Sequence, residues 1–233
     1  DRKGNDLGED LLSVFLSMRD EETGQGMDED EIAEEVLGII VGGQETSATA
    51  LVWTLYELSL NPEIEEKLLD QIMNVTSGEQ INFSRIGELK YLKMVIQESM
   101  RLHPPFWFEN RNAMHDVELG GVRIKKGSMI AISRYALHRN TDYWDDPETF
   151  NPDRFDEESS NNNNASSSFA YQPFSSGPRV CIGRHFAMME MMIILCSILQ
   201  KYKLRVDPHY NHKVATNLTM EPKGGLPVIL ERR

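Results

Sequence analysis

The spacing of apolar residues along the chain predicts a mainly helical protein with small β-sheets, an α+β fold class. Apolar side chains recur every three to four residues in several long segments, which is the pattern of helices with a buried face. The predicted helices cover residues 28–60, 62–75, 86–102 and 183–202. The first is apolar on nearly every side from Val36 to Val41, which indicates a central position in the fold.

The ends of the first helix carry recognisable signals. Asp28, followed three positions later by Glu31, is a capping signature for its start. Asn61 and Pro62 predict its end, with Asn61 as the N-cap of the second helix and Pro62 as the first residue. Inside the first helix, the pair 42–43 is Gly-Gly, and each glycine costs about 0.8–1 kcal/mol relative to alanine. We therefore expect close packing or a ligand against the helix at this point.

Alternation of apolar and polar residues predicts short strands in the second half of the chain. The segment VELGGVRI alternates around Gly120 and Gly121, which is typical of a tight hairpin. Further strands are predicted at 129–133, 203–206, 218–220 and 228–230, with a turn at 224–225. The stretch 142–173 is too rich in proline and aspartate for regular structure, and its part 158–168 is a low-complexity loop.

Composition and charge exclude several classes of protein. The 233 residues carry a net charge of −13, which disfavours nucleic-acid binding because phosphate contacts need clustered Lys and Arg. Two cysteines are too few for a disulfide scaffold. The longest apolar run, 191–199, is about half of the ~18 residues that a membrane span needs. The chain begins DRKGND, without an initiator methionine or a signal-peptide pattern, which predicts a piece of a longer protein.

The candidate chemistry centres on Cys181, which stands before the last predicted helix in FSSGPRVCIGRHFA. The positive end of a helix favours a thiolate over a thiol. Gly177 and Gly183 keep side chains away from the loop, as a flat ligand lying against it would require. Phe174 offers an apolar wall, and Arg179 offers a cation to an acidic group of the ligand.

The residues alone also allow other roles for Cys181. It could be an inert buried thiol, as we expect for Cys196 within MMIILCSIL. It could bind zinc with His185, but structural zinc needs four ligands. A redox nucleophile would need a resolving cysteine, and the sequence has no CxxC motif.

The segment FSSGPRVCIG, residues 174–183, resembles the haem-binding signature of the cytochrome P-450 haem-thiolate monooxygenases. Three more segments resemble the family's motifs in the family's order: GGQETS at 42–47, ESMR at 98–101 and NPDRF at 151–155. Within the family, the sequence looks most like microsomal members such as cholesterol 24-hydroxylase. The resemblance implies that residues 1–233 form the carboxyl-terminal half of a P-450 fold. Its parts would be a long central helix (28–60), the ExxR helix (86–102), a meander loop (142–173), the haem-thiolate loop with its helix (174–202) and terminal strands (203–233).

The resemblance also implies site residues. Cys181 would be the axial ligand of the iron of haem b, and the cofactor-binding residues would be Cys181, Arg179, Arg111, Phe174, Gly177 and Gly183. Arg179 and Arg111 would hold the haem propionates. Thr46, and with it Glu45, would be catalytic by holding water and relaying protons.

Glu98, Arg101 and Arg154 would form a structural ion-pair cluster, although an isolated ExxR sequence is also compatible with an exposed pair. His138 could face the propionates or could be a structural histidine, and this alternative stays open.

The implied activity is insertion of one oxygen atom of O2 into an apolar substrate such as a sterol, fatty acid or xenobiotic. Electrons would come from an NADPH-dependent flavoprotein reductase, docked on the basic stretch that contains Arg184, Lys201 and Lys203, unless these residues form only a solvated helix end. Substrate would contact residues 39–40, 105–108 and 216–218. The resemblance implies the cytoplasmic face of the endoplasmic reticulum membrane, anchored through a missing amino-terminal part. The chain alone is expected to be inactive. The alternative is a truncated, non-catalytic haem-binding or interaction module.

Overall fold

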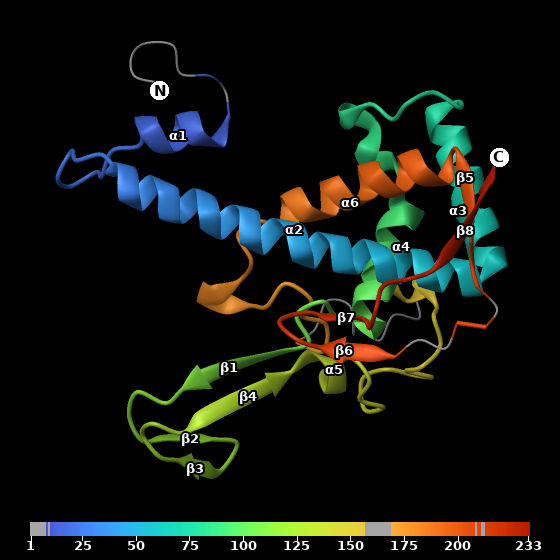
Figure 1. Ribbon diagram of the computed structural model, residues 1–233. Coiled ribbons are helices and arrows are strands. Elements are labelled where there is room, and N and C mark those ends of the chain that lie inside the picture. Colours follow the sequence, from blue (N-terminus) through green and yellow to red (C-terminus); the bar gives the residue numbers. More distant parts are fainter. Residues whose placement is uncertain (1–7, 9, 157–168, 208, 211–212) are drawn as a thin grey trace. The chain divides into compact units, whose positions relative to one another are not determined.

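The computed structural model describes residues 8, 10–156, 169–207, 209–210 and 213–233 (Figure 1). The predicted loop 158–168 lies outside the described residues. The chain divides into two compact units, residues 1–45 and 46–233, and each is described by itself. The first unit holds α1 (Leu11–Ser17), whose N-cap Asp10 accepts a hydrogen bond from Ser13 N–H. It also holds the first part of α2 (Glu29–Leu60), which continues into the second unit.

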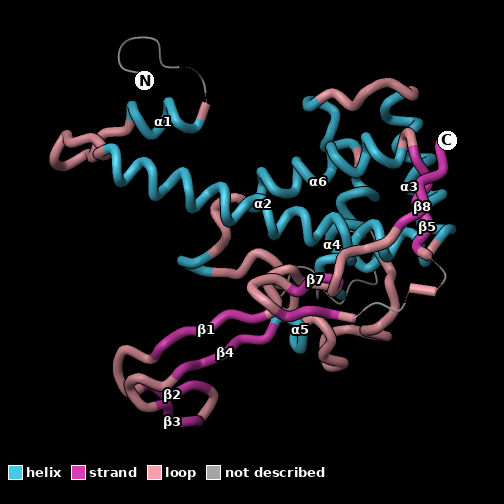
Figure 2. Tube along the Cα trace, viewed as in Figure 1, coloured by secondary structure: helices cyan, strands magenta, loops and turns pink. Residues whose placement is uncertain are grey.

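The second unit is mainly helical, and its strands form small two-stranded sheets (Figure 2). Its other helices are α3 (Pro62–Thr76), α4 (Lys90–Leu102), α5 (Arg134–Leu137) and α6 (Arg184–Leu199), with 3₁₀ turns η1 (Phe83–Glu88), η2 (Pro152–Phe155) and η4 (Gly177–Arg179). The antiparallel strand pairs are β1 (Phe108–Asn112) with β4 (Met129–Ser133), β2 (Val117–Leu119) with β3 (Val122–Ile124), β5 (Tyr202–Val206) with β8 (Val228–Arg232), and β6 (Val214–Thr216) with β7 (Met220–Pro222).

Both ends of α2 show how its boundaries are set. Asp28 N–H donates to the Glu31 carboxylate at 2.9 Å, and Glu31 N–H donates to Asp28 Oδ1 at 2.9 Å, so the predicted capping box is confirmed. The helix runs unbroken through the Gly-Gly pair 42–43. Asn61 is the N-cap of α3 and Pro62 its first residue, as predicted, but the side chain of Asn61 makes no cap bond to α3. Its Nδ2 instead donates to the carbonyl of Glu57 at 2.8 Å and so satisfies the end of α2.

The predicted helix 86–102 is divided in two at Leu89, whose ψ of 57° is not helical. The side-chain oxygen of Gln71 on α3 accepts hydrogen bonds from the backbone N–H groups of Tyr91 and Leu92, at 3.0 and 3.3 Å. These donors belong to the first turn of α4, where a helix has no internal acceptors. The side chain of Gln71 therefore stabilises a helix start that apolar spacing alone does not reveal.

Helix α4 lies at the centre of the main core of the second unit. It contacts α3, α6 and the turn η2, and its residues Leu92, Val95 and Ile96 are fully buried. Burying each such side chain contributes about 1.5–3 kcal/mol relative to exposure. Cys196 on α6 belongs to the same core, and burial raises the pKa of its thiol to about 11. The interpretation of Cys196 as a core residue is confirmed.

The predicted strands are present with one shift, and β1, the partner of β4, was not predicted. Val117 pairs with Ile124 around Gly120 and Gly121, whose φ angles of +56° and +79° fit a tight turn of type I′, so the hairpin is confirmed. This hairpin lies at the far end of the β1–β4 ribbon (Figure 1). The predicted strand 218–220 is wrong in place: the strands are 214–216 and 220–222. Between them Asn217 N–H donates to the carbonyl of Thr219, which forms a turn.

Candidate functional site

A buried ion pair on α4 forms the rigid part of the site. Glu98 and Arg101 lie one helical turn apart, and both side chains are 0% exposed. Two hydrogen bonds join them: Nε to Oε2 at 2.7 Å and Nη2 to Oε1 at 2.8 Å. Burial raises the pKa of the Glu98 carboxyl, and the bonds from Arg101 oppose that rise. An exposed pair, the alternative for an ExxR sequence, is therefore excluded.

Arg101 also binds the backbone of the segment that follows α5. Its Nη1 donates to the carbonyls of His138 and Pro147 at 2.9 and 2.7 Å, and its Nη2 donates to the carbonyl of Thr149 at 3.1 Å. A guanidinium has five N–H donors in a fixed plane, and here all five donate, two to Glu98 and three to backbone carbonyls. Arg101 thus fixes the path of a chain segment that has little regular structure of its own.

The NPDRF segment adds the third member of the cluster. Arg154 Nε lies 3.4 Å from Glu98 Oε1, and its Nη2 donates to the carbonyl of Asp146 at 2.9 Å. Asn151 N–H donates to Glu98 Oε1 at 2.8 Å. The structure therefore brings Glu98, Arg101 and Arg154 together, as the sequence predicted.

His138 connects this cluster to the segment that leads to the cysteine. Its Nε2 accepts the backbone N–H of Gln172 at 3.0 Å, and its ring is fully buried beside Tyr171. Burial, above all, lowers the pKa of His138 to about 3, and the charges of Arg101 and Arg134 act in the same direction. His138 is therefore a neutral, buried histidine with a structural hydrogen bond.

The cysteine stands on a short loop between Phe174 and α6. Its backbone N–H donates to the carbonyl of Phe174 at 2.8 Å, and its side chain is exposed. Gly177 turns the loop with a φ of +66°, and η4 ends at the exposed Arg179. Helix α6 starts at Arg184 and has no side-chain cap. Its first backbone N–H groups, which have no acceptor within the helix, lie at the end that follows Cys181.

The structure shows the surroundings of two residues that were predicted to flank a ligand at Cys181, Phe174 and Gly183. Phe174 packs against the main core. A Cβ built on Gly183 would lie 4.0 Å from the thiol sulfur, which is ordinary contact. The side chains of this chain therefore do not themselves require glycine at position 183. Among the described residues no three His, Cys, Asp or Glu side chains gather in a metal-binding cluster, so zinc at Cys181 has no supporting ligands.

The two arginines predicted to bind carboxylates lie on different elements. Arg179 is exposed at the end of η4. Arg111 on β1 has a side chain that is 43% exposed, and its Nη2 lies 3.4 Å from the carboxylate of Glu109. Each can offer a cation outward.

Thr46 lies at the start of the second unit on α2, and it is half-buried. The same helix is fixed further along by Trp53, whose Nε1 donates to the carbonyl of Met220 at 2.7 Å. The indole stacks on His103 with ring centres 4.1 Å apart, and His103 Nε2 lies 2.6 Å from Glu57 Oε1. Glu45 belongs to the first unit, so its predicted role stays a prediction.

The sequence reasoning missed a second buried ion pair near the cysteine loop. Arg134, at the start of α5, is 2% exposed, and its Nη2 donates to Glu109 at 2.5 Å. Its Nε donates to the carbonyl of Gln172 at 2.7 Å, and its Nη1 donates to the carbonyl of Phe106 at 3.1 Å. The available signal was a lone arginine within the apolar run MIAISRYAL, a position where a charge needs partners.

Comparison with known proteins agrees with this arrangement. The family model described as Cytochrome P-450 matches residues 3–227, and the chain belongs to this family. It is 32% identical over 239 residues to an 11-oxo-beta-amyrin 30-oxidase of Glycyrrhiza uralensis, covering 99% of this chain and 45% of that protein. It is 37% identical over 227 residues to cytochrome P-450 4V2 of Mus musculus, covering 96% and 42% respectively.

A solved structure gives the same result for the fold. The crystal structure of a cytochrome P-450 (CYP102L1) matches with a TM-score of 0.86 and 31% identity, over 96% of this chain and 50% of that chain. The chain thus has the P-450 fold of the carboxyl-terminal half of its homologues and spans less than half the length of the curated relatives named above. A plant and a mammalian relative match at similar identity, so the comparisons support the family and no particular subtype.

Proposed function

We propose that the protein containing this chain is a haem-thiolate monooxygenase that inserts one oxygen atom of O2 into an apolar substrate, with electrons from a flavoprotein reductase. The observation that carries this proposal is the exposed thiol of Cys181, on a loop whose preceding segment is tied to the buried Glu98–Arg101 pair. The more specific parts, a microsomal subtype and anchoring to the endoplasmic reticulum membrane, rest on resemblance. Among the described residues, no helix has both the length and the apolar character of a membrane span.

The residues of the loop fit a haem b group. The thiol of Cys181 is exposed ahead of α6, whose first N–H groups have no side-chain cap. Gly177 has no side chain on the loop, and Arg179 and Arg111 are exposed cations that suit the two carboxylates of a haem. When bound, the haem iron would supply the activation of dioxygen.

The remaining residues would bind, orient and deliver protons. The Thr46 hydroxyl would hold a water and donate a proton, and Glu45 is proposed for the same role. Two segments expected to contact substrate carry exposed apolar side chains: Phe106 is 40% exposed and Leu218 is 60% exposed. Exposed apolar side chains of this size favour an apolar substrate, whose identity and oxidised carbon are not part of the proposal.

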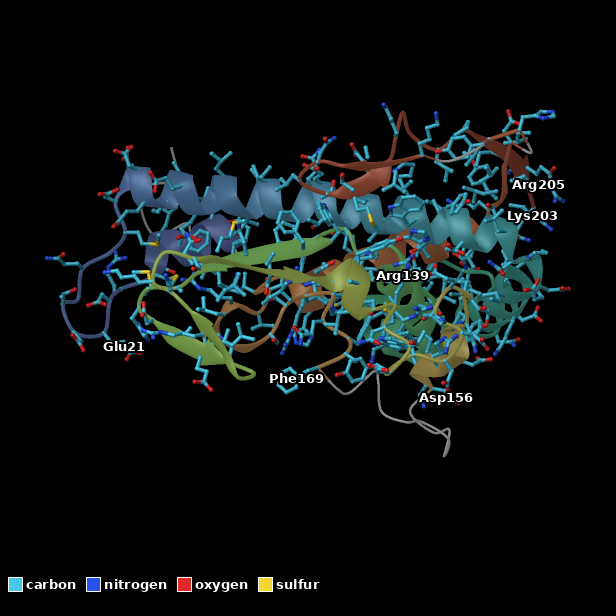
Figure 3. All side chains as sticks on the ribbon, turned by 90° about the horizontal axis from the view of Figure 1, so that it is seen from below. Glu21, Arg139, Asp156, Phe169, Lys203 and Arg205 are labelled. Carbon is cyan, nitrogen blue, oxygen red and sulfur yellow. The ribbon has the colours of Figure 1, made fainter. Side chains whose placement is uncertain are left out.

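The basic residues predicted to dock a reductase form two groups. Arg179 and Arg184 precede or begin α6, whereas Lys201 and Lys203 follow its end, and 16 helical residues span about 24 Å. Lys203 and Arg205 lie near each other on β5 (Figure 3), and Arg205 pairs with Glu231 at 3.0 Å. We therefore place the reductase contact at Arg179 and Arg184, next to Cys181, because electron transfer needs proximity to the thiol side.

A spectrum tests the proposal. The full-length protein is reduced under carbon monoxide, and the long-wavelength Soret band of a thiolate-ligated haem is expected. The Cys181→Ala variant should lack this band, and the Cys196→Ala variant serves as the matched control with the band retained. An unchanged spectrum in Cys181→Ala would overturn the proposal.

The same spectrum, together with a turnover assay, distinguishes the proposed monooxygenase from the alternative, a haem-binding or interaction module without catalysis. A thiolate band without turnover of any tested lipid would favour that alternative. We expect the 233-residue chain by itself not to turn over substrate, because it spans less than half the length of its named relatives.

A further inference from the structure

The carboxylate of Glu109 joins three elements around the cysteine loop. It accepts from Arg134 at 2.5 Å and from the hydroxyl of Ser175 at 3.1 Å, and it lies 3.4 Å from Arg111 Nη2. Glu109 and Arg111 belong to β1, Arg134 begins α5, and Ser175 belongs to the loop that carries Cys181. One partly buried carboxylate, with 11% of its side chain exposed, therefore contacts both the cysteine loop and a predicted propionate ligand.

We propose that Glu109 and Arg134 are positioning residues that set the cysteine loop, and with it the thiolate of Cys181, against strand β1. This inference rests on the proposed function for the role of the thiolate. It gives the Glu109–Arg134 ion pair, which is separate from the Glu98–Arg101 pair, a positioning role on the side of the fold where the cofactor would bind.

The bonds of Arg134 explain why the pair is a positioning device. Its Nε donates to the carbonyl of Gln172, just before the cysteine loop. Its Nη1 donates to the carbonyl of Phe106, just before β1. A guanidinium holds its donors in a fixed plane, so these bonds set both distance and angle between the two segments. Its 2% exposure removes competing water.

The backbone of Ser175 gives an independent observation. Its φ is +64°, a conformation that non-glycine residues adopt only when surroundings hold them there. Its N–H donates to the carbonyl of Gln172 at 3.2 Å, and its hydroxyl donates to Glu109. Glycine would adopt this φ without strain, so the serine is explained by its hydrogen bond to the carboxylate.

The orientation of Arg111 depends on the same carboxylate. Its Nη1 donates to the carbonyl of Asn110 at 2.9 Å, and its Nη2 faces Glu109 at 3.4 Å. With these contacts on one side, the 43% of the side chain that remains exposed presents the cation outward. Loss of Glu109 would thus disturb the thiol side and the carboxylate-binding side together.

The test uses variants of the full-length haem protein. Glu109→Gln removes the charge at nearly constant shape, and Arg134→Lys keeps the charge but loses the planar fork. In both we expect about tenfold more of the carbon-monoxide complex to lack thiolate ligation, because a charge-assisted hydrogen bond is lost. Arg85→Gln, which breaks the exposed Arg85–Glu88 pair, is the matched control and should leave the spectrum unchanged.

Hydrogen exchange of the 233-residue chain without haem supplies a readout independent of the cofactor. The amide of Cys181, bonded to Phe174, should exchange about tenfold faster in Glu109→Gln and in Ser175→Ala than in the wild type. Ser175→Gly loses the hydroxyl but relieves the strained φ, so it should lie between Ser175→Ala and the wild type.

A double variant separates positioning from mere stability. Glu109→Leu with Arg134→Met replaces the pair by apolar side chains, which often restores stability. We expect its urea midpoint to lie above that of Arg134→Met alone, in which the carboxylate has lost its partner, while the Cys181 amide stays fast-exchanging and the thiolate signature stays reduced. Wild-type exchange and spectrum in this variant would overturn the inference.

If the double variant does not fold, amide exchange in Arg134→Lys and Ser175→Ala decides. A wild type without a thiolate band would refute the proposed function, and the exchange data would still decide whether the pair positions the loop.

Discussion

His138 gives a prediction whose magnitude follows from the structure. Burial lowers its pKa from 6.5 to about 3 in the folded protein. As pH falls below 6.5, the unfolded chain takes up a proton at this histidine and the folded chain does not. The folded state therefore keeps the full contribution of His138 above pH 6.5 and loses it as pH falls toward 3.

The size of this effect is set by the separation of the two pKa values. Each pH unit between them is worth about 1.4 kcal/mol, so lowering the pH from 7 to 5 should cost the folded state about 2 kcal/mol through this residue. That is a large part of the 5–15 kcal/mol that stabilises a typical domain. The perturbation that removes this term is His138→Gln, whose side-chain oxygen can still accept the N–H of Gln172.

The assay is urea unfolding of the chain at pH 7, 6 and 5, followed by the fluorescence of its three tryptophans. Other groups titrate in the same range, so the quantity that matters is the difference between wild type and His138→Gln. We expect the variant to lose about 2 kcal/mol less than the wild type between pH 7 and 5. His115→Gln, at an exposed histidine, is the control and should follow the wild type. Equal losses in wild type and His138→Gln would refute the reasoning.

Further predictions concern other fixed points of the fold. Arg101→Leu should abolish near-UV circular dichroism, because an unpaired buried carboxylate costs about 3–5 kcal/mol and three carbonyls also lose their donor. A folded variant would contradict this. Trp53→Phe should lower the free energy of unfolding in urea by about 1–2 kcal/mol through loss of the bond to Met220, and an unchanged midpoint would count against that bond. Thr46→Val in the full-length haem protein should keep the thiolate band but release more of the consumed electrons as hydrogen peroxide. Unchanged peroxide, measured against NADPH consumed, would remove Thr46 from proton delivery.

The order and type of the main helices could be predicted because α3 and α4 bury a face with regular apolar spacing, α2 begins with a capping box, and α6 holds the longest apolar run. The division at Leu89 could not, since the acceptor that stabilises the start of α4 is Gln71, a side chain about twenty positions earlier on another helix. Local periodicity carries no information about such a partner. The hairpin at Gly120 could be predicted because a two-residue turn needs positive φ, which is a local property.

The candidate site likewise contains residues that local motifs reveal and residues that only distant contacts in the fold bring together. Glu98, Arg101 and Cys181 could be found because they stand in motifs whose spacing is local. Arg134 and Glu109 are separated by 25 positions and meet only after β1 and β4 have paired and α5 has turned back. The basic stretch shows the opposite case, because Arg184 and Lys201, close in sequence, stand at opposite ends of α6.

The recognition of backbone carbonyls by Arg101 has a consequence for how this protein can diverge. Every residue type supplies a carbonyl, so substitutions at Pro147 or Thr149 leave the acceptors of Arg101 in place. The arginine itself has no such freedom, because no other side chain carries its planar set of donors. Evolutionary constraint is thereby concentrated on a single buried position, while the segment that it organises can accumulate mutations with its course preserved.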